Sequence, residues 1–242
     1  MSRSAVGSED AVTAHEEWHR ERLRALVAPQ GNLSLIETRW YAPGAELPPG
    51  DLEAAAGGTV KATALSRTDL DTGLPQQGLR RWDAASDAIA AFEGVDVYDY
   101  DPAWVITGTY APLADGHTIA FEHLRDNGRT RDLAVPGVIT AQVAGTEYRL
   151  SAFDDGGILL LVFGDPTNAD TTYESGRFLF VERGSDAFGH EGEVVLDFNR
   201  AFVPPCGFSS HYNCPLPPAS NRFTVPVTAG EKRPRFAAGF DH

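Results

Sequence analysis

Both cysteines of the chain and one histidine lie in a proline-rich stretch between Pro204 and Pro218. Cys206, His211 and Cys214 have the spacing C-x4-H-x2-C. Two thiolates and one imidazole suit zinc, and three protein ligands with an open fourth position are typical of catalytic zinc. A structural zinc site would need a fourth ligand. The alternative is that both cysteines are small, buried, apolar residues that anchor the loop. We favour this alternative and predict no metal ion and no cofactor.

Polar and charged residues flank this stretch and form a second candidate site. One interpretation is a ligand pocket at the mouth of a β-barrel, where such pockets are common. Arg177 or Lys232 would then face an anionic ligand, and Asn199 and Asn221 would orient it. The other interpretation is a structural clasp, meaning side chains that only fix the loop, because an unpaired buried charge is costly. The candidate ligand-binding residues are Arg177, Asp197, Asn199, Cys206, Cys214, Asn221, Glu231 and Lys232.

Residues 15–19 read His-Glu-Glu-Trp-His, which is formally the His-Glu-x-x-His pattern of zinc proteases. On a helix this spacing places His15 and His19 on one side, with Glu16 available as a base. The pattern lies near the N-terminus, and the next segment reads as a strand rather than a second ligand-bearing helix. We therefore interpret the two histidines as residues of a solvated helix face.

Several other enzyme signatures are missing from the sequence. It contains no serine in a nucleophile-elbow pattern, no Walker A loop and no G-x-G-x-x-G after a strand. A hydrolase with a catalytic triad and a nucleotide-dependent enzyme are both disfavoured. No catalytic residue is assigned, and whether the protein is an enzyme stays open at this point.

The composition limits the partners. The chain has 34 acidic and 20 basic residues, a formal charge of −14 at pH 7, which disfavours binding to nucleic acid. No stretch approaches the ~20 apolar residues that span a bilayer, and the first residues do not resemble a signal peptide. We expect a cytoplasmic protein without membrane partners, monomeric or weakly dimeric. Cys206 and Cys214 are then expected as thiols, with a disulfide as the alternative.

The elements that must position these residues are one helix and many short strands. A helix is predicted over residues 8–28, capped by Ser8 and with Trp18 on its buried face. The first strands are expected within residues 33–66, and a short helix within 83–92. A connection is expected at 43–58 and a loop at 71–78. The main antiparallel body covers residues 100–232, with a last strand at 222–228. This pattern predicts a mainly β fold, a barrel or sandwich, in a single domain over residues 1–242.

The C-terminal third resembles a known family through several short motifs. These are FGDPT at 163–167, TY at 172–173, GRFL at 176–179, DFNRA at 197–201, PC at 205–206, CPLPP at 214–218, NR at 221–222 and AGEK at 229–232. They are similar to the bacterial and archaeal family called domain of unknown function 1684 (DUF1684), and weaker similarity extends upstream. Ser220 stands where the family often has an acidic residue, and Gly31-Asn32-Leu33 replaces its Gly-Trp-Leu. The resemblance implies no reaction and no cofactor.

We therefore expect a small-molecule-binding protein, with enzymatic activity open, whose polar site is built from residues 197–232. One alternative is a metal-dependent enzyme that uses Cys206, His211 and Cys214. The other is a non-catalytic interaction domain in which the same segment is a structural clasp.

Overall fold

The computed structural model describes residues 6–184 and 188–240, which fall into two compact units. Of the described residues, the first unit comprises 6–20, 95–184, 188–204 and 213–234. The second comprises 21–94, 205–212 and 235–240. No helix in the described ranges is long and apolar enough to cross a membrane.

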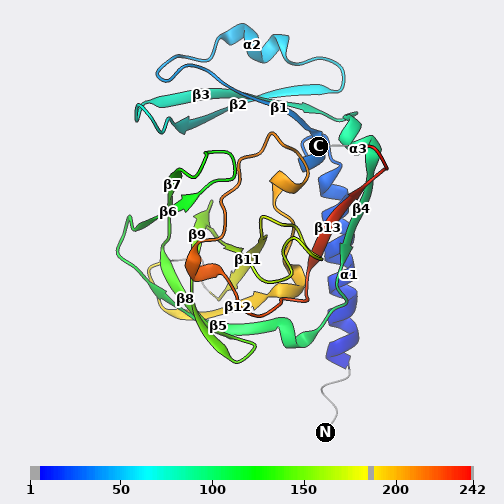
Figure 1. The fold of residues 1–242 in the computed structure, drawn as a ribbon, viewed down its shortest axis with the longest axis vertical. Coiled ribbons are helices and arrows are strands. Elements are labelled where there is room, and N and C mark those ends of the chain that lie inside the picture. Colours follow the sequence, from blue (N-terminus) through cyan, green and yellow to red (C-terminus); the bar gives the residue numbers. More distant parts are fainter. Residues whose placement is uncertain (1–5, 185–187, 241–242) are drawn as a thin grey trace. The chain divides into compact units, whose positions relative to one another are not determined.

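The chain is mainly β, as the sequence predicts, and Figure 1 shows its elements. The helices are α1 (Val6–Leu26), α2 (Pro49–Ala54) and α3 (Asp87–Ala91), with 3-10 turns η1 (Asn32–Ser34), η2 (Pro102–Trp104), η3 (Phe198–Arg200), η4 (Pro205–Gly207) and η5 (Ala219–Asn221). The strands are β1 (Leu35–Trp40), β2 (Val60–Thr68), β3 (Pro75–Asp83), β4 (Phe92–Val97), β5 (Val105–Pro112), β6 (Thr118–Glu122), β7 (Thr130–Ala134), β8 (Gly137–Val143), β9 (Thr146–Asp155), β10 (Ile158–Phe163), β11 (Arg177–Arg183), β12 (Gly192–Asp197) and β13 (Glu231–Phe236).

The first unit is built on a closed barrel of six strands in the order β10-β11-β12-β5-β8-β9. Closure leaves no sheet edge unpaired, and in a barrel this small side chains fill the interior. Alternate residues of each strand point inward, for example Leu159, Leu161 and Phe163 of β10, all at most 1% exposed. On β11 the inward positions are Leu179 and Val181. The same phase places Arg177, two residues earlier, on the interior side at the end of the barrel.

The predicted helix is confirmed as α1, but the prediction of its buried face is wrong in part. Among residues 9–20 the only buried side chain is His15, at 5% exposure, while Trp18 is half-buried and Ala14 is exposed. An imidazole counts as polar in a hydrophobic pattern, so the sequence did not mark this position. The prediction that Ser8 caps this helix is wrong, because α1 begins at Val6 and Ser8 lies within it.

The second unit contains the antiparallel sheet β1-β3-β2. Residues 75–78 of the predicted loop are the start of its central strand, because Gln76, Gln77, Arg80 and Arg81 hide the alternation of β3. Pro75 is the first residue of this strand, where a missing backbone donor is tolerated. The predicted connection at 43–58 contains the short helix α2, and the expected helix within 83–92 is α3.

The predicted strand at 222–228 is also wrong. This segment makes one isolated bridge, between Arg222 and Gly164, and the strand comes later as β13. Val225 and Val227 alternate as in a strand, but the backbone of Val227 bonds to side chains: its N–H to the Asp165 carboxylate and its carbonyl to Arg177. An extended segment paired with side chains has the strand pattern without a ladder.

Candidate functional site

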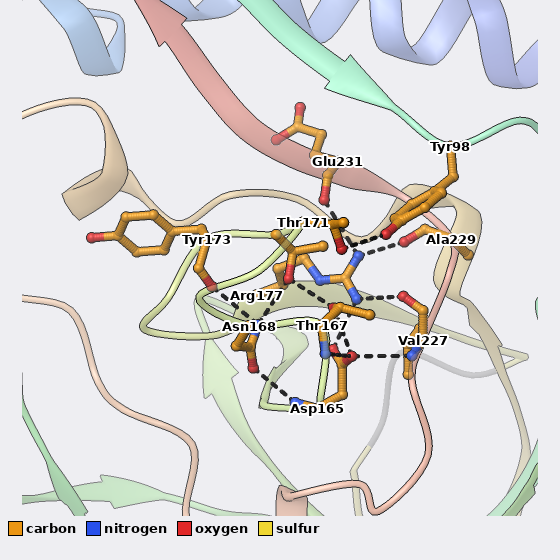
Figure 2. A network of polar contacts seen from close by, with 11 residues as sticks. Tyr98, Asp165, Thr167, Asn168, Thr171, Tyr173, Arg177, Val227, Ala229 and Glu231 are labelled. Atoms are coloured by element: carbon orange, nitrogen blue, oxygen red, sulfur yellow. Dashed lines mark hydrogen bonds and ion pairs between the residues drawn. The ribbon is translucent and has the colours of Figure 1, made fainter.

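Arg177 occupies the end of the barrel interior and is completely buried (Figure 2). Its Nη1 donates to the carbonyls of Ala229 at 2.5 Å and Glu231 at 3.3 Å. Its Nη2 donates to the Val227 carbonyl at 2.8 Å and to Asp165 Oδ2 at 2.9 Å. Burial lowers the pKa of the guanidinium, opposed by the charge of Asp165 and its hydrogen bond. These bonds tie the segment 227–231 to the barrel.

Asp165 is the partner carboxylate and is equally enclosed, with a side-chain exposure of 0%. Its Oδ1 accepts from the Thr167 N–H at 2.9 Å, the Thr167 hydroxyl at 2.7 Å and the Val227 N–H at 3.1 Å. Both carboxylate oxygens are thus used within the chain, as a buried charge requires. Asp165 was not among the predicted site residues, although it precedes the loop that ends at Arg177.

Asn199 joins two segments that are distant in the sequence. Its amide accepts from the Asp101 N–H at 2.9 Å and donates to the Asp101 carbonyl at 3.0 Å and to Asp197 Oδ1 at 2.9 Å. Asp197 also caps η3 through the Asn199 N–H and lies 3.4 Å from Arg200 Nε. Asn199 is 1% exposed, and its amide bonds to the Asp101 backbone and to the Asp197 carboxylate.

Asn221 plays the same part in the loop after the prolines. Its Nδ2 donates to the carbonyls of Ser151 and Val162, both at 2.8 Å, and its Oδ1 accepts from the Ser151 N–H at 2.9 Å. These groups belong to β9 and β10, so the amide holds the loop against the barrel wall. Asn221 is 0% exposed.

Glu231 is buried without touching Arg177 through its carboxylate. Oε2 accepts the Val203 N–H at 2.7 Å, and in Figure 2 the carboxylate points away from the guanidinium, which contacts the Glu231 carbonyl instead. The preceding Gly230 has φ +77°, and a Cβ there would lie 2.5 Å from the Ala201 carbonyl oxygen. Glycine is needed for this close approach.

Five buried residues therefore bond to the chain itself through their side chains, although Arg177 Nε has no hydrogen-bond partner among the described residues. We call this set the structural clasp: Asp165, Arg177, Asn199, Asn221 and Glu231. Lys232 differs, because it is half-buried and its Nζ lies 4.4 Å from the centroid of the Tyr98 ring. The Tyr98 hydroxyl is 2.8 Å from the Thr171 hydroxyl.

The cysteine and histidine residues considered above as alternative metal ligands form no metal cluster in the part of the chain that the structure describes. Cys206 and Cys214 are buried, are not joined in a disulfide, and fall in the second and first unit, respectively. Within residues 6–184 and 188–240 no group of three or more His, Cys, Asp or Glu side chains could hold a metal ion. This applies to Cys206, His211 and Cys214 and also to His15 and His19.

A pocket of about 220 Å³ lies beside the structural clasp, between the β10–β11 loop and the proline loop. We call it the loop pocket; its lining is Leu124, Asn168, Glu174, Ser175, Gly176, Leu216, Pro217 and Arg222. Gly176, at φ +93°, allows the loops to touch, since a Cβ there would lie 2.7 Å from Pro217 Cγ. The Arg222 guanidinium is exposed and makes no ion pair or side-chain hydrogen bond among the residues that the structure describes.

The loop pocket has rigid walls. Asn168 accepts from the Asp165 N–H at 2.8 Å and donates to the Thr172 hydroxyl and the Tyr173 carbonyl, both at 3.0 Å. Arg222 directly follows Asn221, so its backbone is fixed by the structural clasp. Gly176 and Arg222 belong to the family motifs, but the sequence did not place either residue in a site.

These features define a class of protein: a closed antiparallel β-barrel with a long loop locked onto one end by buried polar side chains. The family model described as "Protein of unknown function (DUF1684)" matches residues 90–232. The chain belongs to this family, which confirms the resemblance seen in its motifs.

The solved structures contain a similar fold. The solution NMR structure of an uncharacterized protein of Haloarcula marismortui aligns with a TM-score of 0.55 and 23% identity, over 93% of this chain and 96% of that one. At this identity the likeness concerns the fold alone. A comparison with curated proteins found no match.

Proposed function

We propose that the protein binds a small anionic molecule in the loop pocket. The observation that carries this proposal is the exposed Arg222, whose guanidinium has no partner among the described residues although its backbone is held by the clasp residue next to it. A guanidinium with free donors on an anchored backbone is suited to carboxylate or phosphate oxygens.

The size of the pocket supports a ligand of few atoms. Its 220 Å³ is smaller than the ~300–1,000 Å³ of typical pockets for drug-sized ligands. Phosphate or a short-chain carboxylate fits this volume. The Ser175 hydroxyl in the lining can donate a further hydrogen bond to an oxyanion.

The structural clasp supports binding indirectly. Asn168 and Asn221 fix the two loops before a ligand arrives, and pre-organisation reduces the entropy cost of binding. We place the ligand contact on Arg222 rather than on Arg177, Asn199, Asn221 or Glu231, because those four side chains are buried and already bond to the chain. We also propose a cytoplasmic location, where Cys206 and Cys214 would stay reduced as buried thiols.

A chemical-shift titration tests this function. The ¹⁵N-labelled protein is titrated with inorganic phosphate and, separately, with acetate, at constant ionic strength. We expect saturable shifts confined to residues 174–176, 216–217 and 222, in the millimolar range typical of one unscreened ion contact. Arg222→Gln should abolish them, whereas Arg149→Gln, an exposed arginine of β9 outside the lining, should not. Shifts that are scattered, do not saturate or persist in Arg222→Gln contradict the proposal.

A further inference from the structure

His15 holds the first half of α1 in place within the first unit. Its ring is 5% exposed and stacks on Trp18, with centroids 5.6 Å apart and planes at 20°. The Tyr100 ring, in the segment that follows β4, lies 5.9 Å from the His15 ring between centroids, and His15 Nε2 is 3.4 Å from the Tyr98 carbonyl oxygen. His15 is the one fully buried side chain of residues 9–20, beside the half-buried Trp18 and His19, so we infer that docking of this segment is sensitive to the state of this ring.

The surroundings of the ring suit only the neutral imidazole. Nε2 can donate to Tyr98, but the buried Nδ1 has no hydrogen-bond partner among the described residues. A neutral ring leaves Nδ1 as an unused acceptor, whereas a protonated ring carries a second N–H that needs an acceptor. A buried donor without an acceptor is destabilising.

The nearby charges do not compensate for burial. Asp197 favours the protonated form, but its Oδ1 accepts from Asn199 and its Oδ2 lies 3.4 Å from Arg200 Nε. Arg200 and His19 disfavour a further positive charge. Burial is the largest influence and lowers the pKa of His15, opposed first by the bond to Tyr98.

We propose that His15 is a pH-sensitive latch: its protonation releases residues 9–20 of α1 from the 98–101 segment and the end of β12. The released state leaves the ring in water, with an ordinary pKa near ~6.5. The docked state has a lower pKa, so below about pH 6.5 the released state binds more protons. Docking is therefore complete above this pH and weakens as the pH falls toward the docked pKa, with an opening constant that rises up to about tenfold per pH unit.

Hydrogen exchange measured by mass spectrometry tests the latch. Wild type, His15→Phe and the control His117→Phe, which alters an exposed histidine of the same unit, are compared at about pH 5 and about pH 7.5, with exchange corrected for intrinsic rates. Wild type and His117→Phe should lose protection in residues 9–20 at the lower pH, by at most about tenfold per pH unit, while the barrel strands keep theirs. His15→Phe should show no such pH dependence in this segment.

Two outcomes overturn the proposal: protection of residues 9–20 that does not change with pH in wild type, or a change that persists in His15→Phe. If His15→Phe does not fold, the titration of the His15 ring in the wild type decides by NMR. A pKa of His15 at or above its ordinary value excludes the latch.

Discussion

Replacing Arg177 by methionine should destabilise the protein strongly, although methionine fills much of the same volume. The substitution removes the donor to three backbone carbonyls and leaves Asp165 as an unneutralised carboxylate with a side-chain exposure of 0%. Breaking a buried ion pair by deleting one partner typically costs ~3–5 kcal/mol. That is a large share of the ~5–15 kcal/mol that stabilises a domain.

The double variant Asp165→Leu with Arg177→Met separates two explanations of this loss. A simple buried ion pair replaced by apolar residues is often neutral. Here the N–H groups of Thr167 and Val227 and the carbonyls of Val227 and Ala229 would still lose their partners. Each buried group left unsatisfied costs ~1–3 kcal/mol, so the double variant should remain at least ~3 kcal/mol below wild type.

Urea denaturation of wild type, both single variants and the double variant measures these free energies. A loss below about 1 kcal/mol for Arg177→Met, or a double variant as stable as wild type, refutes the reasoning. The first result would show that Arg177 does not stabilise the packing of the segment 227–231. The second would show that its bonds to the backbone contribute nothing beyond the ion pair.

Three further predictions follow from the same contacts. Asn199→Ala should lower the free energy of unfolding by ~2–3 kcal/mol, since three hydrogen bonds are lost. Lys232→Met should change it by no more than ~1 kcal/mol, because among the described residues the lysine side chain contacts only the Tyr98 ring. Equal losses of the two variants in urea titrations would contradict this. Gly176→Ala should reduce the thermal midpoint, because its φ is +93° and a Cβ meets the Phe163 carbonyl oxygen at 2.5 Å, and an unchanged midpoint would disprove the close packing of the loops. Trp18→Ala should cost less than the ~3–5 kcal/mol of a fully buried ring, because Trp18 is half-buried, and a loss in that range would show tighter docking of α1.

The barrel could be predicted because its strands alternate and are separated by turn residues. Ile139, Ala141 and Val143 of β8, separated by Thr140 and Gln142, show the alternation clearly. Prediction from this alternation fails where polar residues occupy a strand, as in β3. It also fails where the backbone of an apolar segment bonds to side chains instead of to a neighbouring strand, as at residues 222–228. In both cases the structure depends on which groups accept and donate the hydrogen bonds of the segment's backbone, and the sequence does not show these groups.

The candidate ligand-binding residues show a second limit of prediction from the sequence. Arg177 is in phase with the inward residues Leu179 and Val181, so its burial followed from the strand period. The sequence did not show that the N–H groups of Arg177 donate to backbone carbonyls rather than to a ligand. Those carbonyls belong to residues 50 or more positions later in the chain. The contact between Pro217 and Gly176, which shapes the loop pocket, is likewise invisible before the loop folds back.

The central claim is a division of roles between two adjacent residues: Asn221 fixes the proline loop and Arg222 is left for a ligand. Urea denaturation of Asn221→Ala and Arg222→Gln side by side tests it most directly. The structure predicts a loss of about 3 kcal/mol or more for Asn221→Ala, since four hydrogen bonds of its amide disappear. Arg222→Gln should have the midpoint of the wild type. Similar losses in the two variants would contradict the account, because Arg222 would then belong to the structural clasp.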